Sequence, residues 1–287
     1  MSKKPKVFIA RPDLPQSALL LLKDKYELDT WEEERTVPRD VLLQRISGKT
    51  GLWITSSQKV DSEFLNAAGS NLKVIATMSV GFDHIDVAEV KKRNVKLGYT
   101  PGVLDDAVAE LTVALLLSRS RRLFEGRDAI VKGEWKDWIS WSWLNGTGLK
   151  DSVVGIIGLG RIGIEVAKRL LPFKVKKILY VSRTSKEEAK ELKAVKVELG
   201  DLLSESDFII VTCALNEGTE NLLGDKEFAL MKKTAIIVNT SRGKIINQDA
   251  LVRALKSNKI GGAALDVMTP EPLPKDHQLL PLPNCCK

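Results

Sequence analysis

The chain of 287 residues is 44% hydrophobic and 28% charged, which is typical of a soluble globular protein and leaves room for two domains. Its net charge of +7 would suit a nucleic-acid-binding protein, but the sequence has no arginine-rich tract, zinc-ligand spacing or aromatic RNA-binding signature. We therefore expect no nucleic-acid partner, and the basic charge is better matched to small anions such as carboxylates and phosphates.

Cysteine usage and hydropathy indicate a cytoplasmic protein. The three cysteines, Cys213, Cys285 and Cys286, have no framework spacing, which is typical of a reducing compartment. The first apolar run is too short for a signal peptide, and the most apolar stretch, residues 107–118, is interrupted by Glu110. We expect neither a membrane-spanning segment nor a metal site.

Short β-branched runs alternate with amphipathic helical patterns through the first third of the chain. Strands are predicted at residues 6–10, 51–55, 73–80 and 95–100, and helices at residues 15–26, 61–69 and 86–94. Alternation of this kind predicts parallel strands that are joined by crossover helices.

The alternation restarts after a long helix that is predicted over residues 104–124. Five further strands are predicted at residues 152–158, 177–182, 208–213, 234–239 and 262–267. We therefore predict an α/β fold with two Rossmann- or flavodoxin-like domains, each built on a parallel sheet. The domains are residues 1–103 and residues 104–287, and the second is expected to bind a dinucleotide.

Three glycines form the pattern Gly-x-Gly-x-x-Gly between an apolar strand and a helical sequence. Gly158 would allow the tight turn, Gly160 would let the backbone approach a pyrophosphate, and Gly163 would let the helix pack on the strand. The helix N-terminus, with Arg161 and Ile162, would then present free N–H groups to the phosphates. The pattern alone is weak, but its place between strand and helix favours a cofactor site.

An arginine follows the next strand, about 20 residues after the last glycine, where NAD-binding proteins usually have an acidic residue. Arg183 cannot accept hydrogen bonds from ribose hydroxyls, but its guanidinium suits a phosphate. Thr184, Ser185 and Lys186 add donors around it. The sequence therefore predicts NADPH or NADP as the cofactor, and the alternative is a solvated loop arginine.

Five motifs together carry a resemblance to a known family. They are, in order, MSVGFDHID, YTPGVLDDAVAELTVALLL, GIIGLGRIG, NTSRGKIINQDAL and LDVMTPEPLP. Their order resembles the D-2-hydroxyacid dehydrogenase family, and most closely its glyoxylate/hydroxypyruvate reductases. The resemblance implies NADPH-dependent reduction of small 2-keto acids, glyoxylate and hydroxypyruvate, to glycolate and D-glycerate. It also implies that residues 1–103 form a substrate-binding domain.

The resemblance assigns substrate-binding and catalytic roles to four residues. Arg242 would bind the substrate carboxylate and polarise the keto oxygen, a task that suits a permanently charged, bidentate guanidinium. The backbone at Val80 and Gly81 would hold the other carboxylate oxygen. Glu271 matches the glutamate that supports a catalytic histidine. From its spacing alone, Arg242 would be interpreted as a helix-cap or surface residue. Glu271, between two prolines, would be interpreted as a turn residue.

The same resemblance places three further residues around the cofactor. Thr240 and Asp266 fall where the family lines the nicotinamide half. Ala214 falls where the family meets the adenosine half.

The family's proton-donating histidine follows an apolar strand that comes after a Pro-Asn pair. Here that strand has barely begun at Asn284 when the chain reaches Lys287. We expect neither His84 nor His277 to replace this histidine. The expectation from the sequence is a truncated isoform or incomplete gene product that lacks its general acid, with activity in doubt.

Four tryptophans, Trp135, Trp138, Trp141 and Trp143, gather after the long helix. Such density is typical of an interface, and with the long helix it resembles the family's dimerisation arm, so we expect a homodimer. The alternative is a locally packed loop. Two alternative functions also stay open: a non-catalytic NADPH-binding isoform, and a dinucleotide-sensing, corepressor-like binding module, against which Arg183 argues.

Overall fold

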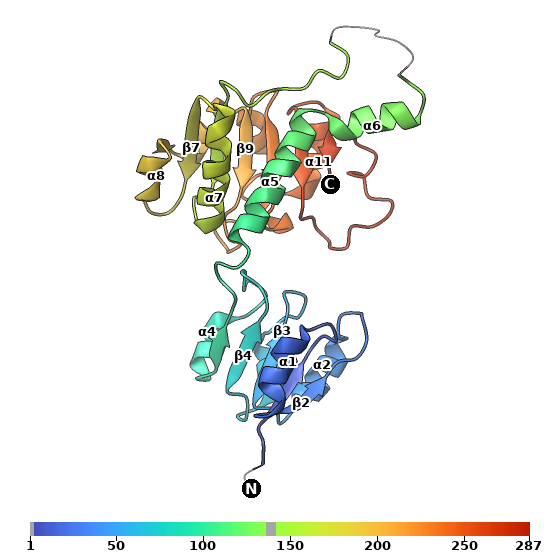
Figure 1. Cartoon of the computed structure of the whole chain (residues 1–287), viewed down its shortest axis with the longest axis vertical. Coiled ribbons are helices and arrows are strands. Elements are labelled where there is room, and N and C mark those ends of the chain that lie inside the picture. The colour runs from blue at the N-terminus through green and yellow to red at the C-terminus, as the bar shows by residue number, and fades with distance from the viewer. Residues whose placement is uncertain (1–2, 136–141) are drawn as a thin grey trace. The chain divides into compact units, whose positions relative to one another are not determined.

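The computed structural model describes residues 3–135 and 142–287. The chain divides into two compact units, Met1–Val103 and Leu104–Lys287, which we call the first and the second unit. Each unit holds one sheet whose strands are all parallel, with helices on its faces (Figure 1), so the predicted α/β class with two parallel sheets is confirmed. Within the described residues, no helix combines the length and the apolar character that crossing a bilayer requires.

The first unit contains five strands in the order β2-β1-β3-β4-β5. In chain order its elements are β1 (Lys6–Ile9), α1 (Gln16–Lys23), β2 (Glu27–Thr30), α2 (Arg39–Ile46), β3 (Gly51–Ile54), α3 (Ser62–Ala68), β4 (Val74–Thr77), α4 (Val87–Lys92) and β5 (Lys96–Gly98). Its core packs around Phe8, Leu52, Phe64 and Ile75, each at most 2% exposed. Because strand order reverses between β1 and β3, the carboxyl ends of these strands flank a hollow.

The second unit contains seven strands in the order β12-β11-β10-β9-β6-β7-β8. In chain order its elements are α5 (Asp105–Ser120), α6 (Leu123–Val131), β6 (Val153–Ile157), α7 (Arg161–Leu170), η1 (Leu171–Phe173), β7 (Lys177–Val181), α8 (Glu188–Glu191), β8 (Ala194–Lys196), α9 (Leu199–Glu205), β9 (Phe208–Val211), α10 (Asp225–Leu230), β10 (Ile236–Asn239), η2 (Gly243–Ile245), α11 (Gln248–Lys256), β11 (Gly262–Leu265) and β12 (Cys285–Cys286). The order is that of a Rossmann fold with one added strand, and it reverses between β6 and β9.

The central strands of the second unit are buried on both faces. All four residues of β9, β10 and β11 are buried, which explains why their sequences are apolar runs without alternation. One hydrophobic cluster includes buried residues of α10 and α11, and another includes buried residues of α5 and α7. Helices α5 and α7 lie in front of the sheet in Figure 1. This two-sided burial fixes the carboxyl edge of the sheet, where the site lies.

The edge strands β2 and β8 were absent from the sequence prediction. Their sequences, ELDT and AVK, are short and only partly buried, so they lack the apolar run that marked the central strands. Both pair on one side only, with β1 and β7 respectively. At an edge, one partner and partial burial are enough to hold a polar strand.

The long helix predicted over residues 104–124 is confirmed as far as Ser120, but its continuity beyond that residue is wrong. It ends at Ser120, and a second helix, α6, begins at Leu123 after Arg122 takes a left-handed φ of 56°. The buried Arg119 donates to Glu125 on α6 and to the carbonyl of Pro283 at 3.1 Å. The pairing of Arg119 with Glu125 holds the chain in two helices at this point. Hydrophobic periodicity does not reveal such a pairing, so the sequence did not predict where the helix ends.

Candidate cofactor site and catalytic residues

The glycine turn after β6 has the geometry that its residues predict. Gly158 has a φ of +101°, and a Cβ atom there would lie 2.5 Å from the backbone nitrogen of Cys213. A Cβ atom at Gly163 would lie 2.5 Å from the carbonyl oxygen of Gly158, so α7 packs directly on the turn. At Gly160 a Cβ atom would meet no protein atom within 4 Å. That side is therefore open to a close-approaching ligand.

The N-terminus of α7 begins at the end of this turn. Gly160 is its N-cap residue, and the amide of Ile164 donates to the Gly160 carbonyl at 2.9 Å. The amides of Arg161 and Ile162 precede that first bond, so they are among those that a helix leaves available for an anion. The guanidinium of Arg161 lies 3.6 Å from Asp105, which directs this side chain toward α5.

A cavity of about 610 Å³ lies beside the turn, at the carboxyl ends of β6, β7 and β9. This is the switch point of the sheet, where ligands of open α/β folds bind. Six predicted cofactor residues line the cavity: Gly158, Gly160, Arg183, Thr184, Lys186 and Ala214. The glycine turn, the N-terminus of α7 and the basic loop, residues 182–186, therefore together fit a dinucleotide.

The cavity also has a wall that sequence reasoning missed. It is lined by Cys213, Asn216, Thr219 and Leu222, which belong to none of the quoted motifs. Thr219 donates to the carbonyl of Ala214 at 2.7 Å and accepts from the amide of Asn216 at 2.8 Å, so the loop after β9 is internally braced. Burial raises the pKa of the Cys213 thiol to about 11, so this wall is uncharged at neutral pH.

Six predicted cofactor residues do not line this cavity: Arg161, Ile162, Gly163, Ser185, Thr240 and Asp266. Gly163 is buried inside α7, and its role is the packing described above. Ser185 is exposed within the loop after β7.

Thr240 and Asp266 follow β10 and β11, at the same carboxyl edge of the sheet. The Thr112 hydroxyl donates to the carbonyl of Val108 and lies 2.7 Å from the Thr240 hydroxyl. Because the one proton of Thr112 is used on Val108, Thr240 donates its own proton to Thr112, and the Thr240 oxygen can then only accept further hydrogen bonds. Partial burial, and then the charge of Glu271, raise the pKa of Asp266.

Arg242 lies in the loop that follows β10. The side chain of Asn239 closes this loop, because its Nδ2 donates to the Arg242 carbonyl at 2.9 Å and its Oδ1 accepts from the Ser241 amide at 3.0 Å. Nη1 of Arg242 donates to the carbonyl of Ser241 at 2.8 Å. Glu271 follows β11, and its Oε1 accepts from the Met268 amide at 2.8 Å. Both side chains are thus oriented by their own loops.

Val80 and Gly81 lie in the loop after β4 of the first unit. The Ser79 hydroxyl donates to the Gly81 carbonyl at 2.6 Å and lies 2.7 Å from the Thr77 hydroxyl. The Thr77 hydroxyl also lies 3.1 Å from Nε2 of His84. This network holds the backbone of the loop in place, as a backbone binding site requires.

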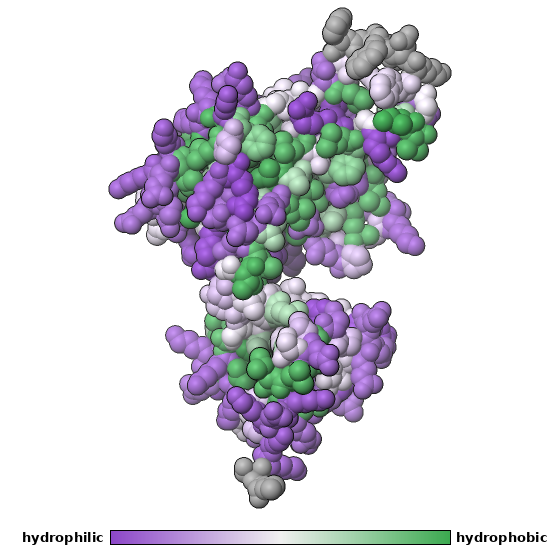
Figure 2. Space-filling model, viewed as in Figure 1, coloured by the Kyte–Doolittle hydropathy of each residue, from purple (hydrophilic) through white to green (hydrophobic). Residues whose placement is uncertain are grey.

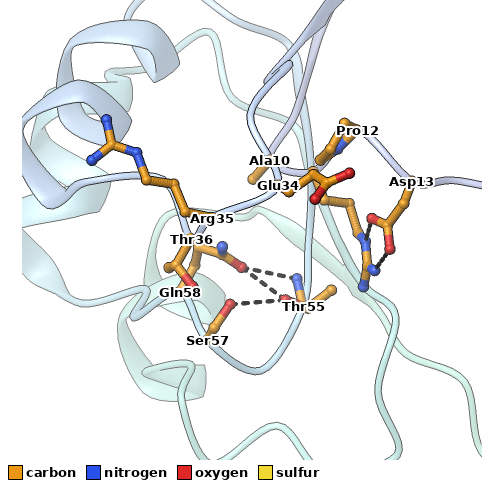
Figure 3. Close-up of a pocket in the computed structure, with 10 residues that line it drawn as sticks. Ala10, Pro12, Asp13, Glu34, Arg35, Thr36, Thr55, Ser57 and Gln58 are labelled. Atoms are coloured by element: carbon orange, nitrogen blue, oxygen red, sulfur yellow. Dashed lines mark hydrogen bonds and ion pairs between the residues drawn. The ribbon is translucent and has the colours of Figure 1, made fainter. Parts of the chain in front are cut away.

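The first unit has a cavity of its own, of about 410 Å³, at its switch point (Figure 3). Arg11 donates to Asp13, and the Thr55 amide donates to Oε1 of Gln58 at 3.1 Å. No sequence motif marks this cavity, because its residues come from three separate loops. Its walls carry charges of both signs, and Glu34 is one of them.

His277 is part of a loop rather than of the cofactor cavity. Its Nε2 lies 3.0 Å from the side-chain nitrogen of Gln248, and its Nδ1 lies 3.1 Å from the Leu279 amide. Among residues 3–135 and 142–287, no group of three or more potential metal ligands gathers.

Known proteins are similar to this chain along almost its whole length. The D-isomer specific 2-hydroxyacid dehydrogenase NAD-binding domain matches residues 113–286. The chain is 47% identical to the glyoxylate reductase/hydroxypyruvate reductase of Mus musculus over 283 residues, which are 98% of this chain and 86% of that protein.

Two solved structures extend this likeness to the fold. A protein from Thermus thermophilus is 39% identical with a TM-score of 0.87, over 98% of this chain and 88% of its own. An NADPH-dependent glyoxylate/hydroxypyruvate reductase from Sinorhizobium meliloti, in complex with NADP and malonate, is 27% identical with a TM-score of 0.82, over 99% and 85%. The chain therefore belongs to the D-isomer specific 2-hydroxyacid dehydrogenase family.

Proposed function

We propose that this protein reduces small 2-keto acids, glyoxylate and hydroxypyruvate, to glycolate and D-glycerate with NADPH. The observation that carries the proposal is the cavity at the switch point of the second unit, lined by both the glycine turn and the basic loop. The substrate class is supported by the name of the Mus musculus relative, to which this chain is 47% identical over 283 residues.

The choice of NADPH rests on the loop after β7. Arg183 and Lys186 bring two positive charges to the wall of the cavity, at the place where an acidic residue would read the ribose hydroxyls. A guanidinium attracts a phosphate and binds it bidentately, whereas it cannot accept the hydroxyl protons. The NADP complex of the Sinorhizobium meliloti relative supports the same choice.

The family resemblance implies which residues would bind the substrate. Arg242 would bind the carboxylate and polarise the keto oxygen, and the amides near Val80 and Gly81 would hold the second carboxylate oxygen. When bound, the nicotinamide supplies the hydride. Charge that develops on the keto oxygen would be stabilised by the guanidinium, which is already oriented by its loop. The role of Glu271 as the support of an imidazole proton donor stays a prediction.

The test separates binding from chemistry. We would titrate the protein with NADPH and then follow NADPH consumption with glyoxylate in the parent, Arg242→Ala and Lys244→Ala. Lys244 is the matched control, because it is an exposed cation of the same loop. Two charge-assisted hydrogen bonds are worth about 3 kcal/mol, so Arg242→Ala should lower kcat/KM by roughly 100-fold and leave NADPH affinity unchanged.

Two outcomes would count against the proposal. Equal activity in Arg242→Ala and in the parent would remove Arg242 from the substrate site. NADPH binding with no turnover of any 2-keto acid would favour the alternative of a non-catalytic NADPH-binding protein.

We also propose a homodimer that forms through α6. Its residues Leu123, Phe124, Ile130 and Val131 are each more than half exposed, and hydrophobic residues gather over α6 in Figure 2. Burial of such a patch in a partner is the usual way to remove it from water.

The tryptophans give only partial support to this dimer. The rings of Trp135 and Trp143 lie 6.2 Å apart between centroids, whereas Trp138 and Trp141 lie outside the described residues. Phe124→Asp should give a monomer in light scattering, whereas Leu21→Asp, at an exposed leucine of the first unit, should not. The cytoplasmic location expected from the sequence also stays a prediction.

A further inference from the structure

The basic loop, residues 182–186, carries Arg183 and Lys186 to the cofactor cavity. Arg183 is exposed and Lys186 is half-buried. A loop at the surface with little packing loses conformational freedom when it binds a ligand, and this ordering lowers affinity. Whatever fixes the basic loop in advance therefore raises its affinity for an anion.

One hydrogen bond ties the backbone of the basic loop to the sheet beneath it. The amide of Lys186 donates to the hydroxyl of Tyr180 on β7 at 3.3 Å. The loop's side-chain bond, from the Ser182 hydroxyl to the Thr184 carbonyl, is internal to the loop. In the described part of the chain, the Tyr180 hydroxyl is thus the anchor that relates Lys186 to the strand.

The anchor itself is held firmly by its surroundings. Tyr180 is 2% exposed and packs in the cluster that contains Ile178 of the same strand and Ala189 and Leu192 around α8. A phenol ring held by this packing keeps its oxygen at one place. Together with the bond from the Ala189 amide to the Lys186 carbonyl, the hydroxyl therefore restrains the backbone of Lys186 and the point from which its side chain extends to the cavity.

We propose that Tyr180 is a positioning residue that sets the affinity of the basic loop for the 2′-phosphate of NADPH. This inference rests on the proposed NADPH function. Tyr180 acts through Lys186 and touches neither substrate nor cofactor. Its hydroxyl accounts for a tyrosine at a buried position where phenylalanine would pack equally well.

The test compares Tyr180→Phe with Ile178→Val. The first variant removes only the oxygen, and the second removes one methylene from a neighbouring buried side chain of the same strand. We would measure NADPH and NADH affinities by calorimetry, and hydrogen exchange of the Lys186 amide. Tyr180→Phe should weaken NADPH about 5- to 10-fold, leave NADH within about twofold, and speed exchange at Lys186 by at least about fivefold. Ile178→Val should change neither the ratio of affinities nor that exchange rate.

Lys186→Ala tests whether Tyr180 affects NADPH affinity through Lys186. If the hydroxyl acts by directing this ammonium group, Tyr180→Phe should cost about twofold or less in NADPH affinity once Lys186 is alanine. An undiminished effect in that background would overturn the assignment to Lys186.

The remaining outcomes separate the inference from the proposed function. A parent that prefers NADPH, with a Tyr180→Phe variant that keeps the full preference, would overturn the role of Tyr180 alone. Equal loss of NADPH and NADH affinity would make Tyr180 a packing residue only. A parent without any preference for NADPH would overturn the proposed cofactor and this inference together.

Discussion

The two units have similar sheets but differ in the turns at their switch points. In the first unit β1 leads into residues 10–13, ARPD, and α1 starts only at Gln16 behind a proline. In the second unit the glycine turn leads directly into α7, and its N-cap residue Gly160 lines the cavity. Parallel topology supplies a hollow in both units. The turn decides whether a helix N-terminus reaches that hollow and can bind phosphate.

The charges around the two cavities also favour an anionic ligand at the second cavity over the first. In the first cavity Arg11 is paired with Asp13, and Glu34 adds a further negative charge. In the second cavity Arg183 and Lys186 line the wall, and no acidic residue is among its lining in the described chain. An anionic ligand is therefore expected at the second cavity and not at the first.

Gly158→Ala should disturb the second unit more than any other change considered. The new Cβ atom would have a strained φ and would lie 2.5 Å from the Cys213 nitrogen, which together should cost about 2 to 5 kcal/mol of unfolding free energy. Gly48→Ala in the first unit is the control, because its φ is +70° and no atom lies within 4 Å. It should cost only about 1 to 2 kcal/mol. Urea denaturation measures both, and equal costs would contradict the close approach at Gly158.

Alkaline pH should weaken the second unit selectively, because all three cysteines belong to it. Burial raises the pKa of Cys213 from 9.0 to about 11, so the folded chain keeps a proton that the unfolded chain loses. The stability is fully present below pH 9.0 and is lost as the pH rises toward 11. The loss should be about 2.7 kcal/mol.

Cys213→Ala should remove that part of the alkaline loss. The check is chemical denaturation of parent and variant at neutral pH and at pH about 11. If both proteins lost the same free energy between these conditions, Cys213 would not have the raised pKa.

Arg183→Asp tests the difference in charge between the cavities. Loss of the charge-assisted contacts should weaken NADPH by about 2 kcal/mol and improve NADH relative to it. Arg35→Asp, at a residue that lines the first cavity, should leave both affinities unchanged. Binding calorimetry measures all four values. A similar loss from both variants would indicate a general field effect instead of a specific site.

Removal of a helix cap should have a weaker effect than these changes, and each unit has a side-chain cap that can be tested. The Asp61 side chain accepts from the Phe64 amide at the start of α3, and the Asn247 side chain accepts from the Ala250 amide at the start of α11, both at 3.0 Å. Alanine at either position should cost about 1 kcal/mol. If the units unfold separately, Asp61→Ala should shift one calorimetric transition and Asn247→Ala the other. A shift of a single common transition by both would show that the units unfold together.

The central part of each sheet could be predicted from the sequence because burial on both faces requires apolar runs. The strands at Phe208–Val211 and Ile236–Asn239 fall inside their predicted ranges for this reason. Edge strands such as Glu27–Thr30 were not predicted, because a partly buried strand can have a polar sequence. The helix break at Arg122 escaped as well, because its cause is a set of tertiary contacts of Arg119.

The parts of the candidate site that are formed by one continuous segment of sequence could be predicted. The glycine turn and the basic loop are continuous in sequence, so their residues could be named from their spacing. The hydroxyl of Tyr180, and the pair formed by Thr112 and Thr240, join residues whose contact depends on the fold. Roles of Arg242 and Glu271 stay predictions that rest on the family resemblance.

According to the proposed function, the cavity of the second unit binds a dinucleotide whose 2′-phosphate contacts Arg183 and Lys186. Titrations of the unmodified protein with NADPH and with NADH at the same salt concentration test this assignment. Both measurements use the same protein, so they are free of any effect of a mutation on folding. NADPH should bind more tightly by about 1.5 to 3 kcal/mol, which is roughly 10- to 150-fold. Equal affinities, or tighter binding of NADH, would contradict this assignment.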